Sequence, residues 1–504
     1  MTTYTLSVVG VVVLIWVVAW NLRSARARQA VLLLACYLFY SSWGIGFLSV
    51  LIASSLLNFA WGSLLRRRLT LGCLWSGVAL NVLLLGFFKY LPPVLDAGWA
   101  SSWQPEFLRQ IVMPVGISFW TFQGLSYLFD VYREEELDPT LLEFCLYMAF
   151  WPTVLSGPVC RLPDMLPQYR QAPVFAWDNF STGALRLIQG LIMKMVLAQL
   201  LGSGLTRGAG VNAGFDQVTA WGGIDVWLLG IAFGFQLFFD FAGYSHMVIG
   251  TARLFGIQLP ENFNRPFLSP TPSIFWIRWH MSLSFWIRDY IFVPLAALRR
   301  DRWWPYVVFI ISMSLFGLWH AAKWTFILWG IYHGLLLVGH RWGQQIKRRF
   351  SMALPGYSGI ILGWGATFSL VSLGWIFFRA NDLNEAFSMF GSVFSPNAYS
   401  HLAMPRSFYL LIAFVGIAYF AYEGMGALLA RWRASYSGVS QPLVFGKRAE
   451  ESIGVIAVEL FEFVAQRMWW WLTPTIFVVA LFITLAIFNR SAAIAVTPFM
   501  YTIF

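Results

Sequence analysis

Two histidines in one short block are the first candidates for chemistry. His320 and His333 lie in residues Phe316–Gly334, with Lys323 between them. A neutral imidazole can take a proton from a hydroxyl group and later return it, which is what a general base does. The competing interpretation is a core histidine that is hydrogen-bonded to a neighbouring carbonyl. We assign that structural role to His333 and His340, and we take His320 as the candidate base.

A second cluster of ionisable side chains lies among tryptophans in residues Phe275–Leu295. On a continuous helix, Arg278, Ser282 and Trp286 would share one face. One interpretation is therefore an amphipathic helix at a membrane surface, whose arginines extend to the lipid headgroups. The other is a functional site, whose candidate residues are Arg278, His280, Arg288 and Asp289.

Motifs for common cofactors are missing from the sequence. It has no nucleotide-binding glycine loop, no zinc-binding HExxH and no GxSxG nucleophile elbow. The four cysteines lie in or beside apolar segments without metal-ligand spacing, which is typical of small core residues. We therefore expect no metal and no bound cofactor. A thioester donor of acyl groups would need no motif visible here.

The composition indicates a membrane protein. Of 504 residues, 59% are hydrophobic and 11% are charged, and the mean hydropathy is +0.65. A soluble domain carries about 25% charged residues. Apolar runs of nearly spanning length recur from 4–20 to 471–488. We predict an all-α, polytopic integral membrane protein with about 11 transmembrane helices in one domain, residues 1–504.

The basic residues indicate orientation in the membrane and not nucleic-acid binding. The formal net charge is +11, but the arginines and lysines lie in short loops between apolar runs, as the positive-inside rule describes. Arginines follow the first apolar run instead of preceding it, so we expect a retained first helix and not a signal peptide. The clusters at 23–28 and 66–68 flank a predicted double crossing with its turn at Gly44 and Gly46.

A second pair of basic clusters points to a turn inside the membrane. The clusters at 299–302 and 341–349 enclose about 36 apolar residues, whereas two crossings and a turn need about 40 or more. The turn near Trp319–Lys323 is therefore expected within the depth of the membrane. Irregular backbone at that depth must pack in protein or line a water-filled cavity. We expect His320 in a buried but water-accessible site.

The run that begins FFDFAGYSHM at Phe238 and ends RDYIFVPL at Leu295 resembles the membrane-bound O-acyltransferase family. Within that family it is similar to the bacterial branch of alginate O-acetylases, peptidoglycan O-acetyltransferases and the teichoic-acid D-alanyl transfer protein. Further similar blocks lie at 116–133, 156–168 and 317–334. The resemblance covers most of residues 30–380 and leaves 381–504 as C-terminal helices and a tail.

The resemblance implies a helical bundle with re-entrant or broken helices around a central tunnel. A cytoplasmic funnel would admit an acyl thioester, either acetyl-CoA or a loaded acyl carrier protein, and an outer funnel would reach the acceptor. His320 matches the family's invariant histidine, and His280 matches the second histidine of bacterial members. Supporting positions at the entrance would be Arg278, Arg288, Asp289 and Trp319.

Departures from the family pattern leave the acyl group open. His246 stands where the alginate-type pattern has an acidic residue, and residues 296–300 read AALRR in place of a glycine pair and Asn-Arg. RWHMSLSFWIRD is also closer to the D-alanyl transfer proteins, so D-alanyl transfer from a carrier protein is one alternative. A transporter or flippase is the alternative from another class, because broken helices with buried ionisable residues suit one equally well.

Tyr501 lies in the final residues PFMYTIF. Bacterial members of this type, or their small partner peptides, resemble it in ending with a tyrosine-containing aromatic motif. One hypothesis is that Tyr501 carries the acyl group as an aryl ester, because a phenol ionises at about pH 10 and is a fair leaving group. The alternative is a tyrosine at the membrane interface.

Taken together, these features predict a multi-pass enzyme of the bacterial inner membrane. It would move an acyl group, acetyl in preference to D-alanyl, from a cytoplasmic thioester to hydroxyls of a surface polysaccharide or peptidoglycan. Expected partners are membrane lipids, the donor or its carrier protein, and a periplasmic esterase-like transferase that the resemblance implies. We expect no nucleic acid.

Overall fold

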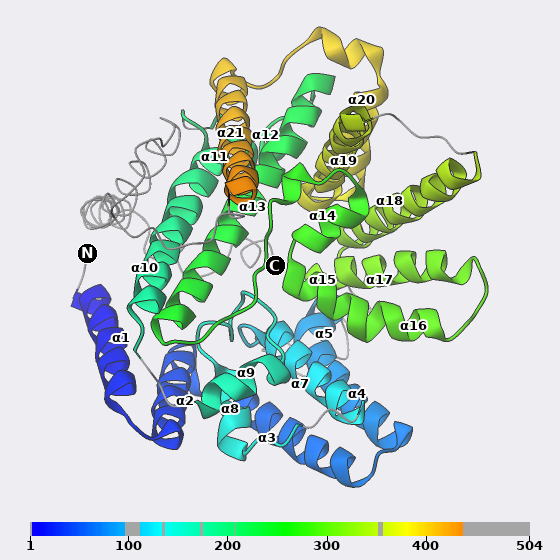
Figure 1. The fold of residues 1–504 in the computed structure, drawn as a ribbon. Helices are drawn as coiled ribbons and strands as arrows, with labels where there is room; N and C mark the ends of the chain where they lie inside the picture. Colours follow the sequence, from blue (N-terminus) through cyan, green and yellow to red (C-terminus); the bar gives the residue numbers. More distant parts are fainter. Residues whose placement is uncertain are drawn as a thin grey trace.

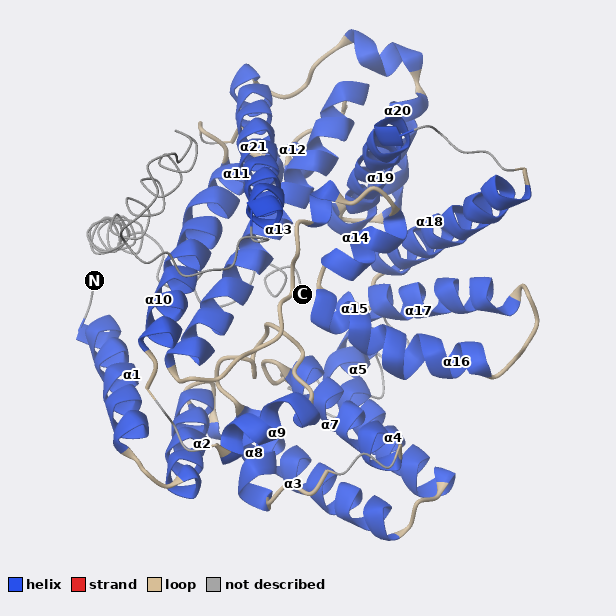
Figure 2. Cartoon of the chain, viewed as in Figure 1, coloured by secondary structure: helices blue, strands red, loops and turns tan. Residues whose placement is uncertain are grey.

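The computed structural model describes residues 3–95, 111–133, 137–171, 175–206, 208–350 and 356–436. These residues form helices joined by loops (Figure 1 and Figure 2), and among them the extended pairing is limited to an isolated bridge between Phe263 and Trp279. The all-α prediction is confirmed. The apolar run predicted at 471–488 and the candidate Tyr501 lie outside the described residues.

The first part of the chain lies mostly in the lower part and along the left side of the view in Figure 1, and its last helices reach the upper part. Its helices, with η1 and η3 as π-helical segments, are α1 (Thr3–Asn21), α2 (Ala25–Ser41), α3 (Ile45–Arg67), α4 (Leu71–Leu85), η1 (Gly86–Tyr90), α5 (Leu91–Val94), α7 (Ile117–Tyr132), α8 (Leu141–Ala149), α9 (Leu162–Arg170), α10 (Trp177–Leu191), η3 (Ile192–Ala198), α11 (Gln199–Ser203) and α12 (Val211–Asp216).

The second part contains the blocks that carry both candidate histidines. Its elements, with η5 π-helical and η4 and η6 3-10 turns, are α13 (Gly223–Leu254), η4 (Pro266–Leu268), α14 (Pro272–Arg278), α15 (Met281–Ile287), η5 (Arg288–Phe292), α16 (Val293–Ala297), α17 (Trp304–His320), α18 (Trp324–Arg349), α19 (Gly356–Arg379), α20 (Leu383–Phe394), η6 (Pro396–Ser400) and α21 (Arg406–Tyr436).

Several helices have the length that a membrane crossing requires. Within the described residues, 6 helical segments are long and apolar enough to cross, and the shorter apolar helices Gly10–Asn21 and Trp304–His320 accompany them. Of the turn predicted at Gly44 and Gly46, the Gly44 position is confirmed, because α2 ends at Ser41 and α3 begins at Ile45, so Gly46 lies within α3. The first apolar run forms the helix α1. The predicted total number of crossings stays a prediction, because 437–504 lie outside the described residues.

α13 is the most enclosed of the long helices. In α13, 83% of the most apolar 18-residue window is buried, compared with 22% in Leu71–Val94. The outer helices expose large apolar side chains, such as Leu83 at 70% and Ile417 at 71%. Figure 1 shows α13 between α10 and α19, and it contacts both. A bundle that turns apolar side chains outward in this way needs lipid as its solvent.

α17 and α18 lie side by side (Figure 1), and two glycines allow their backbones to touch. A Cβ built on Gly317 would lie 2.1 Å from the carbonyl oxygen of Phe326, and one on Gly330 would lie 2.2 Å from that of Met313. Neither position has room for a side chain. Small residues permit this kind of close packing between membrane helices.

The turn predicted near Trp319–Lys323 is confirmed. α17 ends at His320 and α18 begins at Trp324. α17 has 17 residues, so at a rise of about 1.5 Å per residue it is about 25 Å long, less than the roughly 30 Å of a hydrocarbon core. His320 is therefore the last residue of a helix that is too short to cross a bilayer by itself.

Residues 275–295 do not form the continuous amphipathic helix that was one interpretation of the sequence. α14 ends at Arg278, α15 begins at Met281, and the π-helical η5 interrupts the helix again. The break falls at His280, whose φ of 44° and ψ of 52° are left-handed. Arg278 and Ser282 therefore do not share a helix face, and the expectation of broken helices is confirmed here.

Candidate active site

His320 lies in a cage of aromatic rings. His320 is only 4% exposed. Between ring centroids, its imidazole is 4.7 Å from Trp319 and 5.1 Å from Phe316, both on its own helix. Trp329 of α18 lies at 5.5 Å and Phe378 of α19 at 5.0 Å. Walls of this kind exclude bulk water from a reactive group, so the predicted burial of His320 is confirmed, and its predicted access to water stays a prediction.

His280 reaches the same aromatic cluster from the break between α14 and α15. It is 1% exposed, and its left-handed backbone costs on the order of 1–3 kcal/mol for a residue other than glycine. Its ring meets Phe241 edge-on at 4.6 Å and lies 6.5 Å from Phe316. Because Phe316 also stacks on His320, the structure brings the two predicted histidines to one cluster.

Asn262 holds the backbone beside His280. Its carbonyl accepts a hydrogen bond from the N–H of Met281 at 2.8 Å, and its Oδ1 accepts one from Ser282 Oγ at 2.6 Å. Its Nδ2 donates to Ser245 Oγ on α13 at 3.0 Å. Sequence reasoning missed Asn262, because an asparagine in a proline-rich loop is equally typical of an exposed turn.

His333 belongs to the cluster as well. It is fully buried, as predicted, with its ring 5.0 Å from Trp329 and 5.1 Å from Trp276. The predicted hydrogen bond to a neighbouring carbonyl is absent among the described residues, where neither ring nitrogen has a partner. His340 also differs from that expectation, because its Nε2 pairs with the Gln344 side chain at 3.0 Å.

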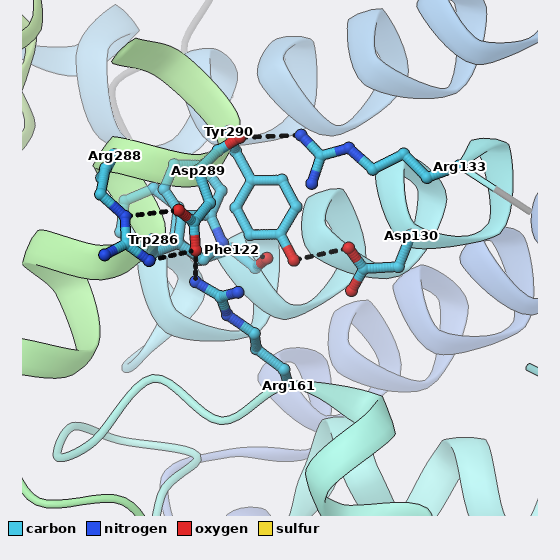
Figure 3. A network of polar contacts seen from close by, with 8 residues as sticks. All are labelled: Phe122, Asp130, Arg133, Arg161, Trp286, Arg288, Asp289 and Tyr290. Atoms are coloured by element: carbon cyan, nitrogen blue, oxygen red, sulfur yellow. Dashed lines mark hydrogen bonds and ion pairs between the residues drawn. The ribbon is translucent and has the colours of Figure 1, made fainter. Parts of the chain in front are cut away.

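Arg288 and Asp289 form a polar network at η5, outside the long apolar helices (Figure 3). The carboxylate of Asp289 accepts hydrogen bonds from Arg288 Nε at 2.6 Å and from Arg161 Nη2 at 2.8 Å. Its backbone carbonyl accepts one from Arg133 Nη2 at 2.8 Å. Burial alone would raise the pKa of the Asp289 carboxyl, but the two arginine side chains lower this pKa below its ordinary value. The network therefore stays charged.

Figure 3 also shows Tyr290 and Trp286 beside this network, and Trp286 packs against Phe122, which leads to the histidine cluster. Tyr290 donates its hydroxyl hydrogen to Asp130 Oδ1 at 2.6 Å, and Trp286 Nε1 donates to the carbonyl of Phe122 at 3.1 Å. The Phe122 ring lies 4.4 Å from Trp286 and 5.4 Å from Trp319. The ring contacts therefore run from Trp286, close in the chain to Arg288 and Asp289, through Phe122 to Trp319, the neighbour of the candidate base.

Two residues singled out from the sequence lie apart from these contacts. Arg278 donates to the carbonyl of Leu268 at 3.3 Å and so supports the loop before α14. His246 on α13 faces the ion pair between Arg186 and Glu261, whose charged atoms are 2.5 Å apart. The structure gives both residues surroundings that differ from those of His280 and His320.

Lys89 is a site residue that the sequence analysis missed. Its Nζ donates to the carbonyl of Trp319 and lies 3.4 Å from Ser118 Oγ and 5.2 Å from the centroid of the Trp319 ring. The only signal in the sequence is a lysine directly after the apolar run 70–88. Its partner lies 230 positions away in the chain, a separation that local patterns do not report.

A cavity of about 270 Å³ lies at the arginine-rich end of α18. On that helix it begins at Leu337, one turn beyond His333. Its polar lining includes Ser273, His340, Arg341, Gln344, Gln345 and Arg348, so it is distinct in character from the aromatic cluster.

Within the described ranges, no group of three or more His, Cys, Asp or Glu side chains is placed to hold a metal ion.

The sequence blocks that build this cluster are those of a known family. Residues 13–380 match the membrane-bound O-acyltransferase family, which extends the N-terminal limit of the resemblance from about residue 30. Residues 455–504, beyond the described part of the chain, match a family of unknown function (DUF5989). The first match includes both candidate histidines, Lys89 and the whole polar network at η5.

Curated relatives cover most of this region. A probable alginate O-acetylase of Azotobacter vinelandii is 35% identical over 387 residues, 75% of this chain and 74% of the relative. A peptidoglycan O-acetyltransferase of Helicobacter pylori is 31% identical over 413 residues, 75% of this chain and 76% of the relative. A teichoic acid D-alanyltransferase of Streptococcus thermophilus is 35% identical over 292 residues, 53% of this chain and 69% of the relative. This chain belongs to the membrane-bound O-acyltransferase family and is a multi-pass bacterial membrane enzyme that transfers acyl groups to oxygen.

Proposed function

We propose that this chain transfers an acetyl group from a cytoplasmic thioester to hydroxyl groups of a cell-surface polysaccharide or peptidoglycan. The observation that carries the proposal is the buried imidazole of His320, caged by aromatic rings at the end of the short helix α17. Two relatives that align over about three quarters of their length are named as O-acetylating enzymes, which favours acetyl over D-alanyl.

His320 is the general base in this proposal. Its imidazole takes the proton of the acceptor hydroxyl while the hydroxyl oxygen attacks the thioester carbonyl. The carbon–sulfur bond then breaks, and the leaving thiolate receives the proton that the imidazole took. The products are an O-acyl ester and a thiol, so the reaction balances without another reactant. His280, which shares the Phe316 ring with His320, positions the donor.

The donor enters from the cytoplasmic side of the inner membrane, as acetyl-CoA or as an acyl carrier protein thioester. The basic loop at 299–302 and the basic end of α18 lie on that side by the positive-inside rule. Arg288, Asp289 and Trp319 line the path of the donor toward His320 in this proposal. It is supported by the Phe122 ring, which contacts both Trp286, close in the chain to Arg288 and Asp289, and Trp319. A periplasmic esterase-like transferase completes delivery to the polymer.

In this proposal, Tyr501 carries the acyl group on the outer side of the membrane. It lies outside the described residues, within the segment that matches the second family. Tyr501→Phe keeps the apolar ring but removes the oxygen that would form the aryl ester. We expect this variant to lose ester formation on the polymer, and full activity would contradict the carrier role.

The test uses a strain that lacks the gene, complemented with wild type, His320→Ala or His340→Gln. His340→Gln is the matched control, because it removes an imidazole that lies outside the aromatic cage. Membrane levels of each protein are compared by immunoblot. Base-labile esters are then released from the envelope polymers and identified by mass spectrometry.

Wild type and His340→Gln are expected to restore an acetyl ester, and His320→Ala is expected to restore none. Release of D-alanine would show that the transferred group is D-alanyl and not acetyl, and it would leave the role of His320 unchanged. Full restoration by His320→Ala would reject the imidazole as the base. If no ester depends on the gene, the proposed acceptor is wrong and transport activity becomes the function to measure.

A further inference from the structure

The end of α17 exposes carbonyl groups that the helix itself cannot satisfy. The last four carbonyls of any α-helix lack an intrahelical N–H partner. In α17, which ends at His320, two of these carbonyls receive hydrogen bonds from adjacent residues of another segment. Tyr90 donates its hydroxyl hydrogen to the Leu318 carbonyl at 3.2 Å, and Lys89 Nζ donates to the Trp319 carbonyl.

The local sequence explains why two adjacent side chains can serve one helix end. Pro92 and Pro93 lack the N–H groups that a regular α-helix would require there, and their rings crowd the preceding turn. The chain forms a π-helical turn over Gly86–Tyr90 instead, closed by the N–H of Leu91 on the Gly86 carbonyl. Such π-helical turns are often found at functional sites, because they redirect side chains.

The lysine is suited to this place by its charge. The C-terminal end of a helix carries partial negative charge, which a cation stabilises. The ammonium group of Lys89 also lies 5.2 Å from the centroid of the Trp319 ring, within the range of a cation–π contact. Lys89 therefore holds both the carbonyl and the indole of the residue that precedes His320.

We propose that Lys89 and Tyr90 are positioning residues that fix the last turn of α17 and thereby the imidazole of His320. The inference rests on the role proposed above for His320. On one side, the backbone of α18 touches Gly317, and on the other, η1 caps Leu318 and Trp319. The base is thus held from two sides by segments that are far apart in the chain.

This arrangement predicts an effect on turnover and not on donor binding. A displacement of about 1 Å in a catalytic group can reduce the rate about 100-fold. Neither Lys89 nor Tyr90 needs to touch the donor to have this effect. Their loss should lower kcat and leave KM for the donor unchanged. Because a smaller amount of folded enzyme would also lower the apparent kcat at unchanged KM, each rate is divided by the amount of folded protein in the membrane.

The experiment compares full-length variants in membranes of the deletion strain, which also supply the acceptor polymer. The variants are Lys89→Met, Lys89→Arg and Tyr90→Phe, with His320→Ala as the inactive reference. Lys323→Met is the matched control, because Lys323 is an exposed lysine three positions beyond His320. Thiol release from acetyl-CoA gives kcat and KM. Ester yield in cells measures activity whichever thioester is the natural donor. Thermal melting reports folding.

We expect Lys89→Met to lower kcat and ester yield about 10–100-fold, with KM and melting temperature close to wild type. Lys89→Arg should recover most of the rate because it keeps a charged donor. Tyr90→Phe should lose less because it removes a single neutral hydrogen bond, whereas Lys89→Met removes both the contact with the Trp319 carbonyl and the one with the Trp319 ring. Lys323→Met should behave as wild type.

Wild-type kcat in Lys89→Met and Tyr90→Phe, with an inactive His320→Ala, would overturn the inference and leave the proposed function standing. A raised KM at unchanged kcat would also overturn it, by assigning Lys89 to donor binding. If Lys89→Met fails to fold, a stable Tyr90→Phe variant with unchanged kcat decides against the inference and one with lowered kcat decides for it. An active His320→Ala would instead refute the base on which the inference rests.

Discussion

Lys194 and Asp240 form an ion pair of 2.5 Å between η3 and α13, and their side chains are only 5% and 8% exposed. Asp240 lies on α13, the most enclosed of the long helices. A buried charge pair tolerates replacement of both partners better than loss of one, because a single remaining charge is left desolvated. This relationship leads to the first prediction.

Asp240→Asn should destabilise the protein by about 3–5 kcal/mol, because it leaves Lys194 without its carboxylate partner. Lower protein levels in the membrane and a lower melting temperature in detergent would show this. Asp138→Asn is the control. It breaks a 3.6 Å ion pair with Arg66, but the Asp138 side chain is 92% exposed, so the change should have little effect. The double variant Lys194→Met with Asp240→Leu should recover part of the loss, and equal melting temperatures for wild type and Asp240→Asn would contradict the prediction.

Gly317→Ala should separate α17 from α18, because the added Cβ would lie 2.1 Å from the Phe326 carbonyl oxygen. The shift would move His320, so we expect ester formation to fall about 100-fold or more. Gly339→Ala on α18 adds the same methyl group where no atom lies within 4 Å, and it should keep activity. Equal ester yields from the two variants would show that close contact at Gly317 does not position the base.

His280→Asn should separate the backbone requirement at this position from the chemical one. Asparagine tolerates the left-handed conformation better than most residues, so the variant should fold and reach the membrane. It lacks the imidazole, and we expect ester yield to fall about 100-fold. His280→Val should in addition lose folded protein, because a β-branched residue is strained there. Wild-type ester yield in the asparagine variant would remove His280 from the mechanism.

The ion pair between Glu143 and Arg170 should make stability depend on pH in the acid range. Burial raises the pKa of the Glu143 carboxyl, but hydrogen bonds from Arg170 and Thr140 lower this pKa below its ordinary value. The resulting stabilisation is therefore present above the unfolded-state pKa of about 4.3 and is lost as the pH falls through the folded-state pKa. Melting temperatures between pH 6 and 3 should fall less steeply in Glu143→Gln than in wild type, and identical slopes would contradict the assignment.

Helix ends and membrane character could be predicted from the sequence because they depend on quantities that run along the chain. The basic clusters and the length of the apolar stretch between them placed the turn at Trp319–Lys323, and α17 indeed ends at His320. The aromatic character of the surroundings of His320 was equally visible, since Phe316, Trp319 and Trp329 lie in the same block.

The break at His280 and the cap on α17 could not be predicted in this way. The left-handed backbone of His280 is fixed by Asn262 and by the bridge between Phe263 and Trp279, which are tertiary contacts. Lys89 reaches Trp319 across 230 positions. A period of 3.6 residues reports which face of a helix is apolar, but it does not report which distant side chain satisfies the end of that helix.

The shortness of α17 has a consequence for how the enzyme responds to its bilayer. A change in hydrocarbon thickness acts on helices whose two ends both lie at membrane interfaces, and those helices tilt or slide in response. With the turn at Trp319–Lys323 placed within the membrane, as the sequence predicts, α17 is about 25 Å long and would meet an interface only at its Trp304 end, while its His320 end is fixed to η1 and α18. Lipids of different chain length should therefore tilt the outer helices and leave the geometry of the base nearly constant.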